Sequence, residues 1–155
     1  MRRKTMLHAL GRHLCLYCGM FLVACAPRQP TITFHSPDGP PKYPFSPAVQ
    51  VGSMLYLAGQ IGTDSTGGLV RGGLEAEAHQ TMRNIADVLA KTGSSMDRVV
   101  KCTVFLLDMK EWPAFNTIYA SYFPGQKPAR SALGANGLAL GSRVEVECLA
   151  VVARR

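Results

Sequence analysis

The feature that most constrains the fold is the segment at 143–153, which reads RVEVECLAVVA. In a β-strand, alternate side chains point to opposite faces of the sheet. One face of this strand would carry Val144, Val146, Cys148, Ala150 and Val152. The other face would carry Glu145, Glu147, Leu149 and Val151. Because both faces are largely apolar, the segment predicts a strand in a sheet that is covered on both sides.

Earlier segments predict the other strands of this sheet. Residues 49–51 and 54–61 alternate as a strand pair, with turn residues between them. Residues 98–109 form a β-branched and apolar run of strand length. A shorter, glycine-broken strand begins near Ala129. The segment 31–35 alternates well enough to add an edge strand.

Two segments predict helices. Apolar residues recur at helical spacing from Leu74 to Leu89, and Gly93 suits a C-terminal cap. In the segment 111–123, Pro113 is tolerable only in a first turn. One face of this second helix carries an aromatic set that we expect to pack in the core: Trp112, Phe115, Tyr119 and Tyr122. The order β-β-α-β-α-β-β predicts a single α+β domain with two helices on one face of the sheet. Since no third helix is expected, a second subunit is the simplest cover for the other face.

The N-terminus predicts a signal sequence followed by a tether. A basic start leads into the apolar stretch 14–24, which has the length of a signal-peptide core and is too short to span a bilayer. The tetrapeptide LVAC, ending at Cys25, resembles a bacterial lipobox, and Ala26 favours sorting to the outer membrane. The expected division is a signal peptide at 1–24, a proline-rich tether at 25–43 and a globular domain at 44–155.

Acylation of Cys25 would anchor the protein to the membrane on the periplasmic side of the cell envelope. The alternative is a mis-called start codon, with a cytoplasmic protein that begins near Thr31 or later. Cys102 and Cys148 are expected to be small buried apolar side chains. Because no CxxC pair lies outside the signal, the sequence gives no support for a metal site. No cofactor is expected.

Composition argues against disorder and against nucleic-acid binding. The chain is 47% hydrophobic and 17% charged, with a formal net charge of +7. Arg2, Arg3, Lys4 and Arg12 lie in the predicted signal; the rest of the chain carries 13 basic and 10 acidic residues. This balance is typical of an ordinary protein surface and not of a phosphate-binding stripe.

From about Pro44 to Arg155 the chain resembles the RidA/YjgF family of reactive intermediate deaminases. The resemblance rests on six motifs in family order: PFSPAVQVG, LYLAGQIG, VVKCTVFLLDM, FNTIYASYF, PARSALGA and VEVECLAV. It implies a chorismate-mutase-like fold, a homotrimer and active sites in the clefts between neighbouring subunits.

The resemblance also implies a catalytic pair. Arg130, in PARS, matches the arginine that holds the substrate carboxylate, and Glu145, in VEVEC, matches the glutamate that positions the attacking water. From the residues alone, Arg130 could equally be a surface ion-pair partner, and Glu145 could be a polar residue at an interface rim. A partly buried carboxylate needs a partner, and Arg130 of a neighbouring chain is the natural candidate.

Four further positions match family site residues, with departures. Gly59, in AGQIG, corresponds to a backbone contributor at the pocket wall, and Asn116, in FNTIY, to an asparagine near the site. Phe45 and Ala132 correspond to substrate-binding positions often held by tyrosine and by a cysteine-like residue. Ala58 occupies a place often held by serine.

Three functions compete at this point. The resemblance implies hydrolytic deamination of 2-imino acids to 2-keto acids and ammonia, which needs both Arg130 and Glu145. A non-catalytic trimer that binds small carboxylates, or a holdase, would need only Arg130 of the two. Nucleic-acid cleavage, sometimes ascribed to the family, lacks the expected basic and aromatic stripe.

Overall fold

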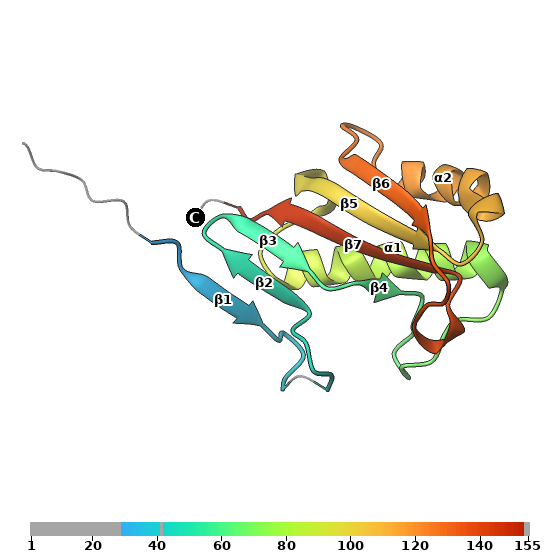
Figure 1. The fold of residues 1–155 in the computed structure, drawn as a ribbon. Coiled ribbons are helices and arrows are strands. Elements are labelled where there is room, and N and C mark those ends of the chain that lie inside the picture. The colour runs from blue at the N-terminus through green and yellow to red at the C-terminus, as the bar shows by residue number, and fades with distance from the viewer. Residues whose placement is uncertain (1–28, 41, 154–155) are drawn as a thin grey trace, which may run out of the picture.

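The structure of the protein is a computed structural model, which describes residues 29–40 and 42–153. Its centre is one seven-stranded sheet, and both helices pack on one face of it (Figure 1). This arrangement confirms the predicted α+β fold. The predicted signal segment and Cys25 lie outside the described residues.

The elements follow the predicted order; the edge strand predicted at 31–35 is present, and the strand predicted at 54–61 forms as two separate strands. The strands are β1 (Ile32–His35), β2 (Ala48–Val51), β3 (Met54–Leu57), β4 (Gln60–Ile61), β5 (Val99–Leu106), β6 (Ala129–Gly134) and β7 (Val144–Val151). The helices are α1 (Gly73–Lys91) and α2 (Trp112–Ser121), and short 3₁₀ turns cover Met96–Arg98, Met109–Glu111 and Ala139–Gly141. No helix of the described chain is long and apolar enough to cross a membrane.

The strands lie in the order β1-β2-β3-β7-β5-β6, and β4 also pairs with β7. Every pair is antiparallel except β5 and β6. These two are parallel because α2 returns the chain across the sheet between them. β1 is the edge strand predicted at 31–35, so part of the expected tether belongs to the sheet.

The helices bury the faces that periodicity predicts, with one exception. α1 buries Leu74, Ala78, Met82, Ile85 and Leu89 against the sheet. In α2, Phe115 and Tyr119 are buried, and Pro113 stands in the first turn as expected. Trp112 was predicted to pack in the core, but 39% of its surface is exposed. It is the first residue of α2, and its ring lies beside Arg130 of the edge strand β6.

The face of the sheet away from the helices is open and largely apolar. Cross-strand register aligns Phe34, Val49, Tyr56, Leu149 and Lys101 in one row on this face. Phe34 is 70% exposed. The open face therefore matches the prediction that the two helices cover only one side.

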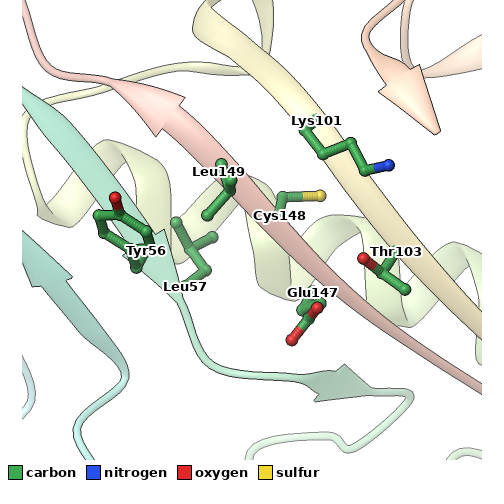
Figure 2. Close-up of a pocket in the computed structure, with 7 residues that line it drawn as sticks. All are labelled: Tyr56, Leu57, Lys101, Thr103, Glu147, Cys148 and Leu149. Carbon is green, nitrogen blue, oxygen red and sulfur yellow. The ribbon is translucent and has the colours of Figure 1, made fainter. Parts of the chain in front are cut away.

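A hollow of about 310 Å³ lies in the middle of the open face (Figure 2). Tyr56, Lys101, Thr103, Glu147 and Leu149 contribute to its lining. Lys101 donates to the Ser131 hydroxyl at 2.8 Å, and in Figure 2 its side chain points away from Glu147. Neither Arg130 nor Glu145 lines this hollow. It is thus not the predicted catalytic cleft.

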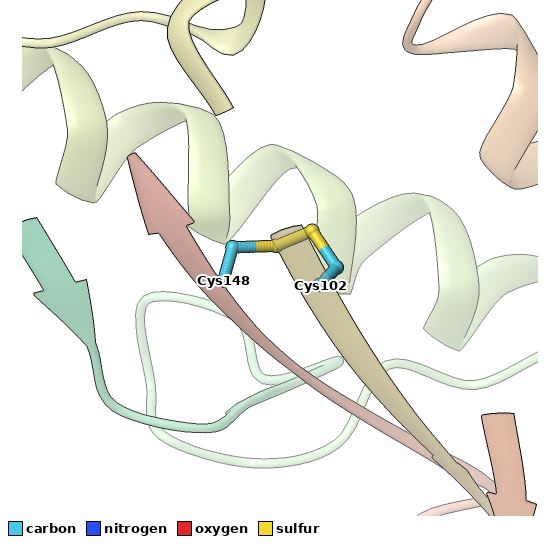
Figure 3. The surroundings of a disulfide bond; sticks show 2 residues. All are labelled: Cys102 and Cys148. Carbon is cyan, nitrogen blue, oxygen red and sulfur yellow. A yellow bond between two sulfur atoms is a disulfide. The ribbon is translucent and has the colours of Figure 1, made fainter. Parts of the chain in front are cut away.

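Cys102 and Cys148 are joined by a disulfide bond (Figure 3). They are directly opposite each other in β5 and β7, with Cα atoms 4.1 Å apart. Both are buried and mid-strand, as predicted. We did not predict the bond, because the sequence does not reveal which residues of two distant strands stand opposite each other.

The strand predicted at 54–61 is interrupted. β3 and β4 both pair with β7, but the three residues 57–59 oppose only Glu147 and Cys148. One extra residue on one strand is a β-bulge, and bulges commonly redirect side chains at functional sites. This bulge contains Gly59.

Candidate functional site

Glu145 projects from β7 on the open face, where it is half-buried. Its carboxylate lies directly against Gly59: a methyl group placed on Gly59 would overlap Oε1 of Glu145. The bulge brings the bare Cα of Gly59 up to the carboxylate. The two residues therefore form one unit.

The environment of Glu145 favours its protonated form. Burial raises the pKa of Glu145 above the usual glutamate value, and the negative charge of Glu147 raises it further. Glu147 lies two residues along the same face of β7. A carboxylate with a raised pKa is a stronger base at the same position, which suits a group that takes a proton from water.

Asn84 in α1 supports this part of the site, although no motif or spacing in the sequence marks it as a site residue. Its Nδ2 donates to the carbonyl oxygens of Ile61 at 2.9 Å and Thr63 at 3.0 Å. Ile61 is the β4 residue opposite Glu145. Asn84 thereby fixes β4 on the helix and holds the far side of the bulge in place.

Phe45 and Ala58 belong to the same end of the sheet. The Ala58 N–H donates to the Pro47 carbonyl at 3.0 Å, so the segment that leads into β2 runs beside the bulge. Phe45 in this segment stacks on Tyr43, with ring centroids 5.4 Å apart, and is 53% exposed. We call Phe45, Ala58, Gly59 and Glu145 the glutamate group.

Arg130 projects from β6 on the helix-covered face. Its Nη2 donates to Oδ1 of Asn116 at 2.6 Å. Its Cζ lies 4.8 Å from the centre of the Tyr119 ring and 5.9 Å from the centre of the Trp112 ring. Ala132 follows two residues later on the same face of β6 and packs against the core.

These five residues, Trp112, Asn116, Tyr119, Arg130 and Ala132, form the arginine group. Sequence reasoning identified Asn116, Arg130 and Ala132 as site residues, but it assigned both aromatic rings to the core. The only sequence signal for the rings was their helical spacing relative to Asn116, which core packing explained equally well.

The two groups lie on opposite faces of the sheet within one chain. Arg130 is in register with Cys102 on the helix-covered face, whereas Glu145 is in register with Phe105 on the open face. One protomer therefore does not bring its own guanidinium and carboxylate together. A site that uses both must take one group from each of two neighbouring chains.

The contact between Gly59 and Glu145 predicts a severe effect for G59A. The added methyl carbon would overlap Oε1 and lie 2.9 Å from Cδ of Glu145, so the carboxylate must move away from its position. We expect kcat/KM to fall at least about 100-fold with little change in thermal stability. Steady-state kinetics and a melting curve check this. The matched control is G125A, at an exposed glycine where a methyl meets no atom within 4 Å. Wild-type kinetics in G59A would show that the position of the Glu145 carboxylate against Gly59 does not matter for the reaction.

Comparison with known proteins decides the family. The model of the family described as endoribonuclease L-PSP matches residues 36–152. The chain belongs to this family. It is the RidA/YjgF family indicated by the six motifs, and its model covers β2 to β7 and both groups of site residues.

Relatives and solved structures of RidA/YjgF proteins agree closely with this chain. A mouse protein named 2-iminobutanoate/2-iminopropanoate deaminase is 46% identical over 109 residues, which cover 70% of this chain and 81% of the relative. The crystal structure of yeast YEO7 is 37% identical with a TM-score of 0.74, and the match covers 79% of this chain and all of that one. RidA from an Antarctic Psychrobacter is 31% identical with a TM-score of 0.71, over 77% of this chain and 98% of that chain.

Proposed function

We propose that this RidA/YjgF protein hydrolyses 2-imino acids to 2-keto acids and ammonia at sites between the subunits of a homotrimer. The observation that carries the proposal is the division of the site residues into an arginine group and a glutamate group on opposite faces of one chain. The mouse relative's name, 2-iminobutanoate/2-iminopropanoate deaminase, supports the reaction class.

The open face supports the trimer. Apolar residues that stand exposed on β1 and β3, such as Phe34 and Tyr56, favour burial against another copy. Such packing would turn the open face of one chain, with Glu145, toward a neighbour. The β6 edge with Arg130 would then line the cleft from the neighbouring side.

The two groups divide the chemistry between them. Arg130 binds the substrate carboxylate through two parallel N–H···O bonds, which fixes the adjacent C=N carbon. Glu145 accepts a proton from water as the water oxygen attacks that carbon, and it passes this proton to the imine nitrogen, which gives a neutral tetrahedral carbinolamine. Glu145 then takes the hydroxyl proton and gives it to the same nitrogen, the C–N bond breaks, and the 2-keto acid forms as ammonia leaves. The reaction consumes one water and needs no oxidant.

The test generates a 2-imino acid in place with an amino-acid oxidase and follows ammonia release. We expect purified protein to accelerate hydrolysis, with R130A and E145Q at the background rate. If wild-type protein does not accelerate the reaction but binds 2-keto acids in an Arg130-dependent way, the protein is a carboxylate-binding trimer.

The raised pKa of Glu145 predicts the pH dependence of kcat/KM. Glutamate acts as a base only when ionised, so activity should fall as pH drops through the raised pKa, which lies above the usual 4.5. E147Q removes the negative charge that is one of the two causes of the raised pKa, so it should move the acidic fall in kcat/KM to lower pH. E147D keeps the charge and should move this fall much less. A pH profile of all three proteins checks this. If the acidic fall in kcat/KM stays at the same pH in E147Q, Glu147 does not raise the pKa of Glu145.

We also propose that the protein is a lipoprotein of the cell envelope, anchored through Cys25. The sequence LVAC supports this, and so does the disulfide, since disulfides persist mainly in oxidising compartments. We expect mature wild-type protein in the membrane fraction with an acylated Cys25, and C25A in soluble fractions. Mass spectrometry of the mature N-terminus checks this. An unacylated protein in the cytoplasm with free thiols would support the mis-called start instead.

A further inference from the structure

We propose that Tyr119 and Trp112 are positioning residues for Arg130, which hold its guanidinium in the orientation that receives the substrate carboxylate. The inference rests on the proposed function for its substrate, but its evidence is the geometry around Arg130. We call the two rings the aromatic clamp.

The first observation is the placement of the rings. The guanidinium carbon lies 4.8 Å from the centre of the Tyr119 ring and 5.9 Å from that of Trp112. Both distances are within the range of cation–π attraction. Tyr119 is nearly completely buried and immobilised by Phe115 and Phe123, whose ring centroids lie 5.7 Å and 4.8 Å from its own. The ring is thus a rigid support.

The second observation is the use of the N–H groups. A guanidinium has five N–H donors. Within the described chain Arg130 makes one side-chain hydrogen bond, from Nη2 to Asn116. Asn116 and the clamp are one helical turn apart on α2, so one element fixes the cation from three positions. The remaining donors are left for a ligand, and a carboxylate uses two of them.

The third observation concerns the Tyr119 hydroxyl, as distinct from the Tyr119 ring. The Tyr119 hydroxyl is buried and has no hydrogen-bond partner in the described structure. Burial raises the pKa of Tyr119 to about 12, against the opposing effect of Arg130, so the ring stays neutral. The hydroxyl therefore contributes nothing to holding Arg130, and a phenylalanine at this position should hold the guanidinium equally well. Cation–π attraction needs only the ring face.

The test compares ring-removing with ring-preserving variants: W112A against W112F, and Y119L against Y119F. Two quantities are measured, KM for the 2-imino acid and the Kd of pyruvate, the simplest 2-keto acid, by calorimetry. We expect both to rise about fivefold in W112A and about tenfold in Y119L. The phenylalanine variants should retain most of the affinity. kcat should change much less than KM, because the clamp acts on carboxylate binding before and during the reaction.

Each outcome bears on the proposal. Tyr119 is buried, so Y119L could unfold the protein. Trp112 is 39% exposed and lies outside the core, so W112A decides the matter in that event. A folded W112A with wild-type KM and Kd overturns the clamp, as does an equal loss in W112F. If wild-type protein binds pyruvate but has no deaminase activity, the proposed reaction fails and Kd alone judges the clamp. If wild-type protein shows no Arg130-dependent pyruvate binding, both proposals fail.

Discussion

A mixture of R130A and E145Q protomers is expected to recover about a quarter of the wild-type deaminase activity, although each variant alone is nearly inactive. Each single substitution removes one half of every site, and we expect kcat/KM to fall at least about 100-fold in either. In a randomly mixed trimer, a site has about one chance in two of receiving an intact Arg130 and about one in two of receiving an intact Glu145.

The experiment unfolds and refolds the two variants together and measures ammonia release against the same variants refolded separately. Recovery requires that the guanidinium and the carboxylate come from different chains. We expect this because the two groups lie on opposite faces of the sheet in one protomer. Separate refolding controls for any gain in activity that refolding itself causes. If mixed trimers form and activity stays at the level of the single variants, the two groups belong to one chain and the intersubunit site is wrong.

Removing the disulfide is expected to lower the free energy of unfolding by about 4 kcal/mol. Cys102 and Cys148 are 46 residues apart in sequence, so the bond closes a long loop in the unfolded chain and restricts its conformational freedom. The native pairing of β5 and β7 remains, because neighbouring backbone hydrogen bonds and apolar residues also hold these strands. The effect should therefore appear in stability and leave the positions of Glu145 and Arg130 unchanged.

Guanidinium denaturation at one fixed protein concentration, with and without a reductant, measures the difference. C102A/C148A is the matched variant: it should resemble reduced wild-type protein and should not respond to the reductant. Both cysteines are buried, so the variant also loses the packing of two sulfur atoms and could fall slightly below the reduced protein. Full reaction of both thiols with a probe in unfolded, unreduced protein would show that the bond does not form.

The interrupted strand shows where sequence reasoning stopped short. Alternating apolar residues over 54–61 predict one strand, and both of its parts do pair with β7. The extra residue in 57–59 is invisible in the alternation, because it depends on which residues of β7 stand opposite. Yet this bulge puts Gly59 so close to Glu145 that a side chain at this position would overlap the carboxylate.

Trp112 and Tyr119 show the same limit on a helix. Their spacing predicts a shared face, and core packing explains that face for Phe115 and Tyr119. The spacing does not show that the face passes over the edge strand β6, where Arg130 lies. An aromatic ring in the core and an aromatic ring against a cation have the same sequence pattern.

The sequence by itself determined the order of strands and helices, the two faces of β7, the exposed second face of the sheet and the identity of Arg130 and Glu145 as candidates. The first three features follow from side-chain periodicity, which acts over a few neighbouring residues. The two candidates follow from the resemblance of their motifs, PARS and VEVEC, to the RidA/YjgF family. Only the tertiary structure decided the disulfide, the bulge at Gly59, the aromatic clamp and the separation of Arg130 from Glu145 by the sheet. Each of these depends on the register between strands that are distant in sequence, and register is set by the packing of the whole sheet and not by any one segment.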